Sequence, residues 1–256
     1  MSSSKIIVDS IVLARMSGSR LPGKVMLPAL GKSILELMID RLRCARSLGR
    51  IVVATSDHSS DDILADLCEA RNIACFRGSL NDVVDRIYNC AKSYDMAHVA
   101  HFGADNPLID SLICDEIVEV YKTNTTRFSY VTNNQPPSYP NGQEVEVTSF
   151  TALEAAWQAT RSEPSTRHSD LFDFILEHGT EFHYKNCTHI VDLYHERWTL
   201  DYQEDYELVR AIFEDLQPRI GSCFGMAHIL DHLGARPELR KLNARFNVKR
   251  PGVRQV

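Results

Sequence analysis

The chain has 256 residues, of which 44% are hydrophobic and 24% charged, and its formal net charge is −6. These values are those of an ordinary globular protein, and the acidic balance argues against a nucleic-acid-binding protein, which usually carries a basic face. No apolar run approaches the roughly 20 residues that span a bilayer, and the first residues lack the features of a signal peptide. We therefore expect a cytoplasmic protein without a membrane or nucleic-acid partner.

Strands and helices alternate regularly in the first half of the chain. Apolar runs predict strands at 6–13, 51–54, 73–76 and 96–102, and helical patterns begin near residues 33, 60, 81 and 111. The first helix has a capping box of Ser33 and Glu36. Such alternation with short loops indicates a parallel sheet covered by helices, which binds ligands beyond the carboxyl ends of its strands. The polar residues that should meet at this edge are Arg15, Asp57, Arg77 and Asp105.

The alternation breaks after residue 132, where a loop rich in turn-forming residues begins. We interpret residues 136–191 as an insertion, a lid or dimerisation segment, because their aromatic and apolar side chains need burial. Residues 198–200 then predict a strand, 201–216 a helix, and about 217–256 a helical C-terminal tail. The whole chain, 1–256, is expected to form a single domain.

The seven cysteines lie at positions 44, 68, 75, 90, 114, 187 and 223, without a C-x-x-C pair. Most are in apolar or helical contexts. This distribution predicts buried free thiols in a reducing cytoplasm and makes a zinc site improbable.

The loop that follows the first strand, LARMSGSRLPGK at 13–24, is the most informative segment. Its glycines let backbone N–H groups approach a ligand, and Arg15, Arg20 and Lys24 bring positive charge. This composition predicts a polyphosphate site, with a basic surface loop as the alternative. A P-loop is excluded, because Val25 stands where Ser or Thr is required, and no G-x-G-x-x-G fingerprint occurs.

The pattern A-R-x-x-S-x-R-L-P-G-K in this loop resembles the signature of sugar-activating cytidylyltransferases of the spore-coat polysaccharide type, relatives of the CMP-sialic acid and CMP-Kdo synthetases. The resemblance implies an α/β, Rossmann-like three-layer nucleotidyltransferase fold with a mostly parallel sheet. It also implies that Arg15 and Lys24 are catalytic. The nucleotide-binding residues expected from it are Leu13, Ala14, Arg15, Ser17, Gly18, Arg20, Lys24, Arg77 and Asp82. For Asp82, a helical ion pair with Arg86 is the alternative.

Two carboxylates follow predicted strands in segments that resemble the family's metal-binding motifs. Asp105 lies in HFGADNPLID, at 101–110, and Asp201 in HERWTLDYQED, at 195–205. Carboxylates at strand ends suit magnesium, although a turn cap is the alternative for Asp105. Asp205, in the first turn of a helix, is interpreted as structural. The resemblance implies that Asp105 and Asp201 bind Mg²⁺.

The segment YPNGQEVEV, at 139–147, resembles the family's Y-P-x-G-x-D-V-E-V, with Glu144 in place of Asp. It predicts a site for sugar hydroxyls, with an exposed loop and edge strand as the alternative. His168, after Arg167, is similar to part of an R-E-H acceptor motif, although the order differs here. The substrate-binding residues expected are Tyr139, Asn141, Glu144, Glu146, Arg167 and Arg197.

The resemblance implies a magnesium-dependent homodimer that joins CTP to an acidic or phosphorylated sugar. The products are pyrophosphate and a CMP- or CDP-sugar for surface polysaccharide or glycoconjugate biosynthesis. Two alternatives stay open: a guanylyltransferase or other NTP:sugar-phosphate transferase, and a non-catalytic protein that binds nucleotide sugars.

Overall fold

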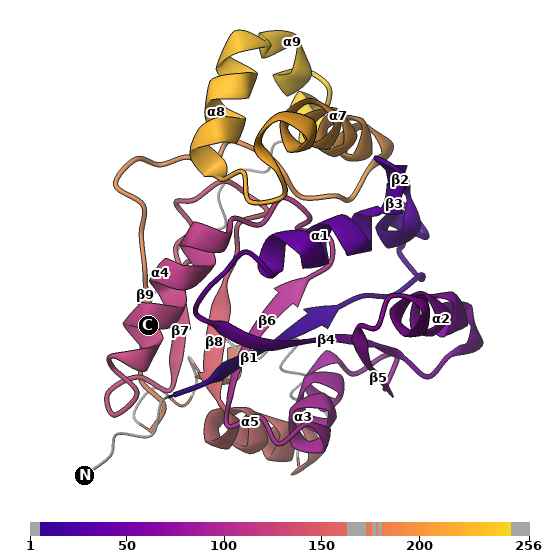
Figure 1. The fold of residues 1–256 in the computed structure, drawn as a ribbon. Coiled ribbons are helices and arrows are strands. Elements are labelled where there is room, and N and C mark those ends of the chain that lie inside the picture. The colour runs from indigo at the N-terminus through magenta and orange to yellow at the C-terminus, as the bar shows by residue number, and fades with distance from the viewer. Residues whose placement is uncertain (1–5, 163–172, 176–177, 179–180, 247–256) are drawn as a thin grey trace.

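The computed structural model describes residues 6–162, 173–175, 178 and 181–246, which are built around a seven-stranded sheet (Figure 1). The strand order is β5-β4-β1-β6-β8-β7-β9, and only β8 runs antiparallel to its neighbours. The mostly parallel α/β sheet predicted from the sequence is therefore confirmed. The strands are β1 (Val8–Leu13), β4 (Leu48–Ser56), β5 (Ala74–Gly78), β6 (His98–Gly103), β7 (Tyr130–Thr132), β8 (Glu146–Ser149) and β9 (Tyr184–Asn186), and a small hairpin holds β2 (Pro28–Ala29) and β3 (Lys32–Ser33).

Helices cover both faces of the sheet. Alternate residues of β1 face opposite sides, so that Val12 packs with α1 and α4 whereas Ile11 packs with α3 and α5. The predicted capping box is present, because Ser33 Oγ accepts a hydrogen bond from the Glu36 N–H and Glu36 accepts one from the Ser33 N–H. One face carries α1 (Ile34–Leu42), α2 (Asp62–Ala70) and α4 (Ser111–Lys122), and the other α3 (Val83–Ser93) and α5 (Phe150–Ser162).

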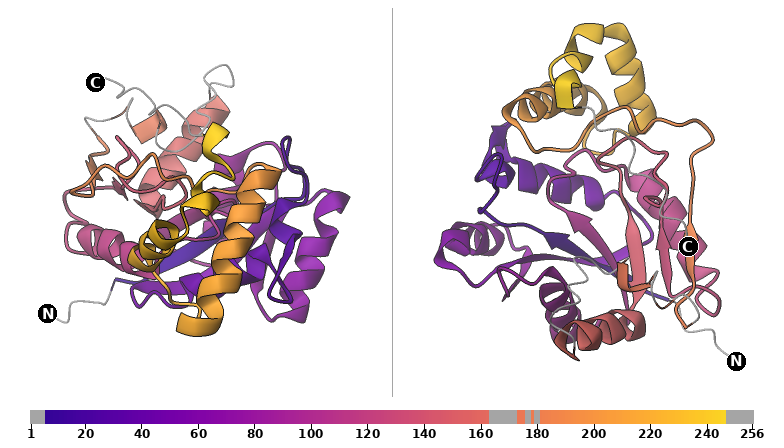
Figure 2. Two further views of the ribbon diagram at one scale, coloured as in Figure 1. Left: turned by 90° about the horizontal axis from the view of Figure 1, so that it is seen from above. Right: turned by 180° about the vertical axis from the view of Figure 1, so that it is seen from behind.

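A C-terminal helical layer lies on the outer side of α1 (Figures 1 and 2). Ile34 and Leu37 of α1 share a core with Trp198, Phe213 and Phe224. The layer contains α7 (Gln203–Ile220), α8 (Met226–Ala235) and α9 (Pro237–Arg240). Short 3-10 turns lie at Lys24–Met26, Ser59–Asp61 and Ala244–Phe246. This layer is added to the three layers formed by the sheet and its two sets of helices, and it covers the outer side of α1. No helix within the described ranges is long and apolar enough to cross a bilayer.

The described part of residues 136–191 buries most of its large apolar side chains against the chain's own sheet, whereas Ile190 and Val191 are 97% and 55% exposed. Strands β8 and β9 join that sheet, and α5 packs against α3. Phe174 and Phe182 are 3% and 7% exposed in the core formed with these helices. Burial of these core side chains therefore needs no second subunit, and the lid and the homodimer stay predictions.

Residues 198–200, predicted as a strand, form an irregular segment instead. The Trp198 N–H donates to the Asn141 carbonyl, but the Leu200 N–H donates to the Asp105 carbonyl. The backbone of this segment thus forms hydrogen bonds with two separate loops, so it is not part of a continuous β-ladder.

Cys44 and Cys223 form a disulfide, so the prediction of free thiols is wrong for these two residues. Their Cα atoms lie 5.7 Å apart although 179 positions separate them in the sequence. They meet because the C-terminal layer returns to the end of α1, a contact that no local pattern reveals. The other five cysteines are free thiols.

Arg41 is a buried arginine that joins α1 to the C-terminal layer. Its side chain donates to the carbonyl oxygens of Leu108, Ile109, Ser222 and Phe224 at 2.7–3.1 Å. Burial lowers the pKa of its guanidinium to about 10, so it stays protonated at neutral pH. Carbonyl groups from two distant segments therefore depend on one side chain.

We predict that Arg41→Met lowers the free energy of unfolding by about 3 kcal/mol, because buried carbonyl groups lose their donor. Urea unfolding of the parent and the variant measures this difference. As a control, Arg43→Met removes a side chain that is 53% exposed at the end of the same helix, and it should leave the unfolding midpoint nearly unchanged. Equal losses in the two variants would contradict the assigned role of Arg41.

Candidate active site

The loop of residues 14–24 leaves β1 beside the end of β6. Leu13 pairs with Gly103 in the parallel register, and the Ala104 N–H donates to the Leu13 carbonyl. A Cβ on Gly103 would lie 2.3 Å from Asp105 Oδ1, so this position leaves room for the carboxylate. The predicted phosphate loop and Asp105 are thus neighbours because two parallel strands end together.

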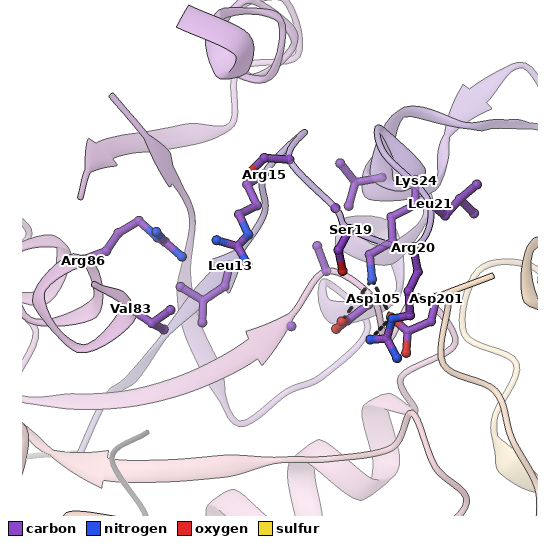
Figure 3. A pocket seen from close by; sticks show the side chains of 15 residues that line it. Leu13, Arg15, Ser19, Arg20, Leu21, Lys24, Val83, Arg86, Asp105 and Asp201 are labelled. Carbon is purple, nitrogen blue, oxygen red and sulfur yellow. Dashed lines mark hydrogen bonds and ion pairs between the residues drawn. The ribbon is translucent and has the colours of Figure 1, made fainter. Parts of the chain in front are cut away.

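The loop and the strand ends enclose a cavity of about 280 Å³ (Figure 3). It brings together both residues predicted to be catalytic, both predicted metal ligands and part of the predicted nucleotide-binding set. These are Leu13, Arg15, Ser17, Gly18, Arg20, Lys24, Asp105 and Asp201.

Lys24 lies between the two predicted metal ligands. Its Nζ is 3.2 Å from Asp105 Oδ2 and 2.9 Å from Asp201 Oδ1. Arg20 Nη2 is also 2.9 Å from that Asp201 oxygen. Carboxylates from distant parts of the chain therefore converge on one cationic group.

Backbone contacts bring the segment before α7 to the end of β6. The Asp105 carbonyl accepts hydrogen bonds from the Leu200 N–H at 2.7 Å and from Thr199 Oγ1 at 3.1 Å. Gly142, with φ of +107°, lets a turn approach this segment, since a Cβ there would lie 2.8 Å from Thr199 N. These contacts hold residues 199–200 against Asp105 and thereby place Asp201 beside it.

Arg197 and Asp205 support Asp201 from the protein side. Arg197 donates to Asp205 from Nε at 2.9 Å and from Nη2 at 2.8 Å, and its Nη2 lies 3.4 Å from Asp201. Burial raises the pKa of Asp205, but hydrogen bonds from Arg197, Asn243 and the Asp201 N–H outweigh it and hold that pKa below its ordinary value. This agrees with the structural interpretation of Asp205. Because the Arg197 guanidinium is turned toward these carboxylates, its predicted contact with substrate stays a prediction.

Asp105 and Asp201 fit a magnesium site by the chemistry of their donors. Both present carboxylate oxygens to the position of one cation, and Mg²⁺ in nucleotide enzymes is held by one or two carboxylates together with phosphate oxygens. Within the described residues no group of three or more His, Cys, Asp or Glu side chains is suited to hold a metal. Phosphate and water would therefore supply the other ligands.

A second cavity, of about 360 Å³, adjoins the first. Among the predicted substrate-binding residues, Asn141, Glu144 and Glu146 line it. The two cavities share Leu13, Val83, Gly103 and Asp105. A nucleotide in one and an acceptor in the other would meet at the ends of β1 and β6.

Two of the carboxylates that line this second cavity, those of Glu144 and Glu146, have shifted pKa values. Burial, together with the charges of Asp105 and Glu146, raises the pKa of Glu144 to about 7 despite a hydrogen bond from the Gly142 N–H. Burial also raises the pKa of Glu146, but His101, 2.8 Å away, outweighs it and lowers that pKa. Near neutral pH the two carboxylates therefore differ in protonation.

Three predicted nucleotide-binding residues do not line the first cavity. Ala14 is 2% exposed and belongs to the core. Arg77 donates to the carbonyls of Ser56 and His58. Asp82 caps α3, since its Oδ1 accepts the Asp85 N–H at 2.8 Å. For these three residues the nucleotide contact stays a prediction.

Two other residues predicted to bind the acceptor, Tyr139 and Arg197, do not line the second cavity. Tyr139 is 4% exposed, and its hydroxyl lies 3.4 Å from Glu116. Arg167 and His168 lie outside the described residues.

Sequence reasoning missed Arg86 as a cavity residue, because its four-residue spacing from Asp82 also suits a surface ion pair. In the part of the chain that the structure describes, these two side chains form no such pair. Arg86 instead lines the first cavity with Val83, three positions earlier on α3. The sequence feature that could have identified Arg86 is its position, as a charged residue, on the apolar face of an amphipathic helix.

Comparison with known proteins gives a family and a fold for this site. The family model described as cytidylyltransferase matches residues 10–220. The uncharacterized protein MJ1063 of Methanocaldococcus jannaschii is 30% identical over 260 residues, which cover 97% of this chain and 98% of that protein. The spore coat polysaccharide biosynthesis protein SpsF of Bacillus subtilis is 27% identical over 215 residues, 80% of this chain and 85% of that protein.

The solved structure of a cytidylyltransferase from Leptospira borgpetersenii is similar over 92% of this chain and 97% of that one, with a TM-score of 0.83 and 26% identity. Because the family model matches residues 10–220, most of the chain, this protein belongs to the cytidylyltransferase family of nucleotidyltransferase enzymes.

Proposed function

We propose that this cytidylyltransferase transfers CMP from CTP to an acidic or phosphorylated sugar and releases pyrophosphate. The observation that carries the proposal is a pair of adjoining cavities that share Asp105. The loop of residues 13–24 lines one cavity, and polar side chains that can accept hydrogen bonds line the other. The printed name of SpsF, a spore coat polysaccharide biosynthesis protein, supports a product used for surface polysaccharide or glycoconjugate biosynthesis.

In the proposed reaction the acceptor oxygen attacks the α-phosphorus in line with the departing pyrophosphate. Lys24, Arg15 and Arg20 line the nucleotide cavity and would neutralise the triphosphate. Asn141, Glu144 and Glu146 would orient the acceptor through hydrogen bonds to its hydroxyl groups. The protein thus contributes position and charge rather than a covalent intermediate.

Asp105 and Asp201 would hold Mg²⁺, which when bound neutralises phosphate charge and orients the nucleotide. The ammonium group of Lys24 lies within hydrogen-bond distance of both carboxylates. This position lets Lys24 contact the phosphates that are next to the two carboxylates.

We predict that pyrophosphate release, measured with four nucleoside triphosphates and a panel of sugars, is fastest with CTP. Lys24→Ala should lower turnover on the order of 10²-fold, because it removes a charge partner of the transition state. Lys32→Ala, whose side chain pairs with Asp40, is the matched control and should keep parental activity. Preference for GTP would indicate a guanylyltransferase, and no turnover with any nucleotide would support a binding protein.

We predict that Asp105→Asn and Asp201→Asn each raise the magnesium concentration needed for half-maximal activity by more than about tenfold. Each variant keeps the shape of the side chain but removes its charge. EDTA should abolish the activity of the parent, and added magnesium should restore it. Asp57→Asn provides the control, because Asp57, although predicted at the same edge of the sheet, is exposed and lines neither cavity. Activity that survives thorough chelation would overturn the metal assignment.

We predict that the KM for an acidic acceptor rises as Glu144 loses its proton. Asp105 and Glu146 face this carboxylate, and its pKa is raised to about 7. The neutral form prevails below this value and the charged form, which repels an anion, above it. In the Glu144→Gln variant this side chain stays neutral at every pH. The KM of the variant for the acidic acceptor should therefore change less than that of the parent between about pH 6 and about pH 8. An equal rise in both proteins would assign the pH dependence to another group.

A further inference from the structure

Arg86 lies at the end of the nucleotide cavity that is far from Lys24. Figure 3 shows Arg86 and Arg15 on one side of the cavity, and Lys24, Asp105 and Asp201 on the other. Arg86 is 2% exposed, so its guanidinium group is enclosed by the protein and the cavity rather than by bulk solvent. A buried cation placed there needs acceptors for its N–H groups.

The protein supplies acceptors to one edge of this guanidinium. Arg86 Nη1 donates to the Ser79 carbonyl at 2.5 Å and lies 3.5 Å from the Leu80 carbonyl. Arg86 Nε is buried and has no hydrogen-bond partner. Burial and the neighbouring Arg15 charge lower the Arg86 pKa, against the opposite effects of Asp61 and Asp82. Nε is sealed from the cavity, but none of the hydrogen bonds that Arg86 forms within the described residues involves Nη2. Because Arg86 lines the cavity, this unpaired end of the guanidinium group indicates that a ligand completes its hydrogen bonds.

The position of Arg86 favours a base over a phosphate as this ligand. The reacting phosphate belongs beside Lys24, Asp105 and Asp201, so the base must extend toward the opposite end. Leu13 and Val83 line the cavity near Arg86 and offer apolar contact to a planar ring. An arginine next to apolar side chains suits recognition of a base edge, because guanidinium donors are arranged as a planar fork.

We propose that Arg86 donates hydrogen bonds to O2 and N3 of cytosine and thereby selects CTP over UTP, an inference that rests on the proposed function. In cytosine both atoms are acceptors, whereas N3 of uracil carries a hydrogen. Uracil would therefore direct an N–H toward the arginine and leave a buried donor without a partner. Enzymes commonly distinguish bases by such hydrogen bonds to the Watson–Crick edge.

The test compares kcat/KM for CTP and UTP in the parent, Arg86→Met and Arg86→Lys. For CTP, Arg86→Met should lower kcat/KM by about 10- to 100-fold, while UTP should change less, because hydrogen bonds specific to cytosine are lost. Arg86→Lys keeps the charge but not the planar fork, so it should also reduce the preference for CTP. A parental CTP:UTP ratio in both variants would overturn the inference.

Ser79→Ala is the control for a purely structural effect. Ser79 Oγ accepts the Asp82 N–H at 3.1 Å, so this change disturbs the same loop without removing the guanidinium group. It should alter kcat/KM for CTP and UTP by the same factor. If Arg86→Met also changes the two nucleotides equally, Arg86 only supports the loop and the inference fails.

Calorimetry with cytidine and with pyrophosphate separates a base contact from a phosphate contact. Arg86→Met and Arg86→Lys should weaken binding of cytidine and leave that of pyrophosphate unchanged. The opposite result would place a phosphate at Arg86 and overturn the inference. If the parent turns over no nucleotide, the proposed function fails, whereas cytidine binding still decides the role of Arg86.

Discussion

The ammonium group of Lys24 holds together the two carboxylates around which the site is built. Asp105 ends β6, and Asp201 precedes α7, so side chains from opposite parts of the chain share one cation. Two carboxylates this close to one point would repel each other without a positive charge between them. Lys24, in the predicted phosphate loop, therefore stabilises the arrangement of Asp105 and Asp201 whether or not a nucleotide is bound.

The C-terminal helical layer positions Asp201, although this layer is separate from the sheet and from the helices that cover it. Asp205 in α7 accepts hydrogen bonds from Arg197 and from the Asp201 N–H, so the start of the helix and Asp201 are linked. Arg41 and the Cys44–Cys223 disulfide join the same layer to α1. The stability of this layer and the geometry of the active site are consequently coupled.

Local patterns predicted the parallel sheet and the capping box at Ser33, because each depends on neighbouring residues. The phosphate-binding role of the loop at 13–24 stays a prediction. Local patterns did not predict the Cys44–Cys223 disulfide or the irregular path of residues 198–200, since both result from contacts between distant segments. The spacing of Asp82 and Arg86 left two interpretations open. In the folded chain Asp82 caps α3 and Arg86 turns toward the Ser79 carbonyl, a choice that the helical spacing cannot specify.

The second cavity is lined by Asp105, Glu144 and Glu146, yet it is compatible with the acidic sugar of the proposed function. Glu146 is paired with His101, and Asp105 is paired with Lys24, so the negative charge of each is partly compensated. Glu144 has a pKa raised to about 7 by burial and by those same neighbours, which leaves it partly protonated at neutral pH. The carboxyl oxygens of this cavity can thus accept hydrogen bonds from sugar hydroxyl groups while repelling an acidic sugar less than three carboxylates would. The strength of that repulsion depends on the protonation of Glu144.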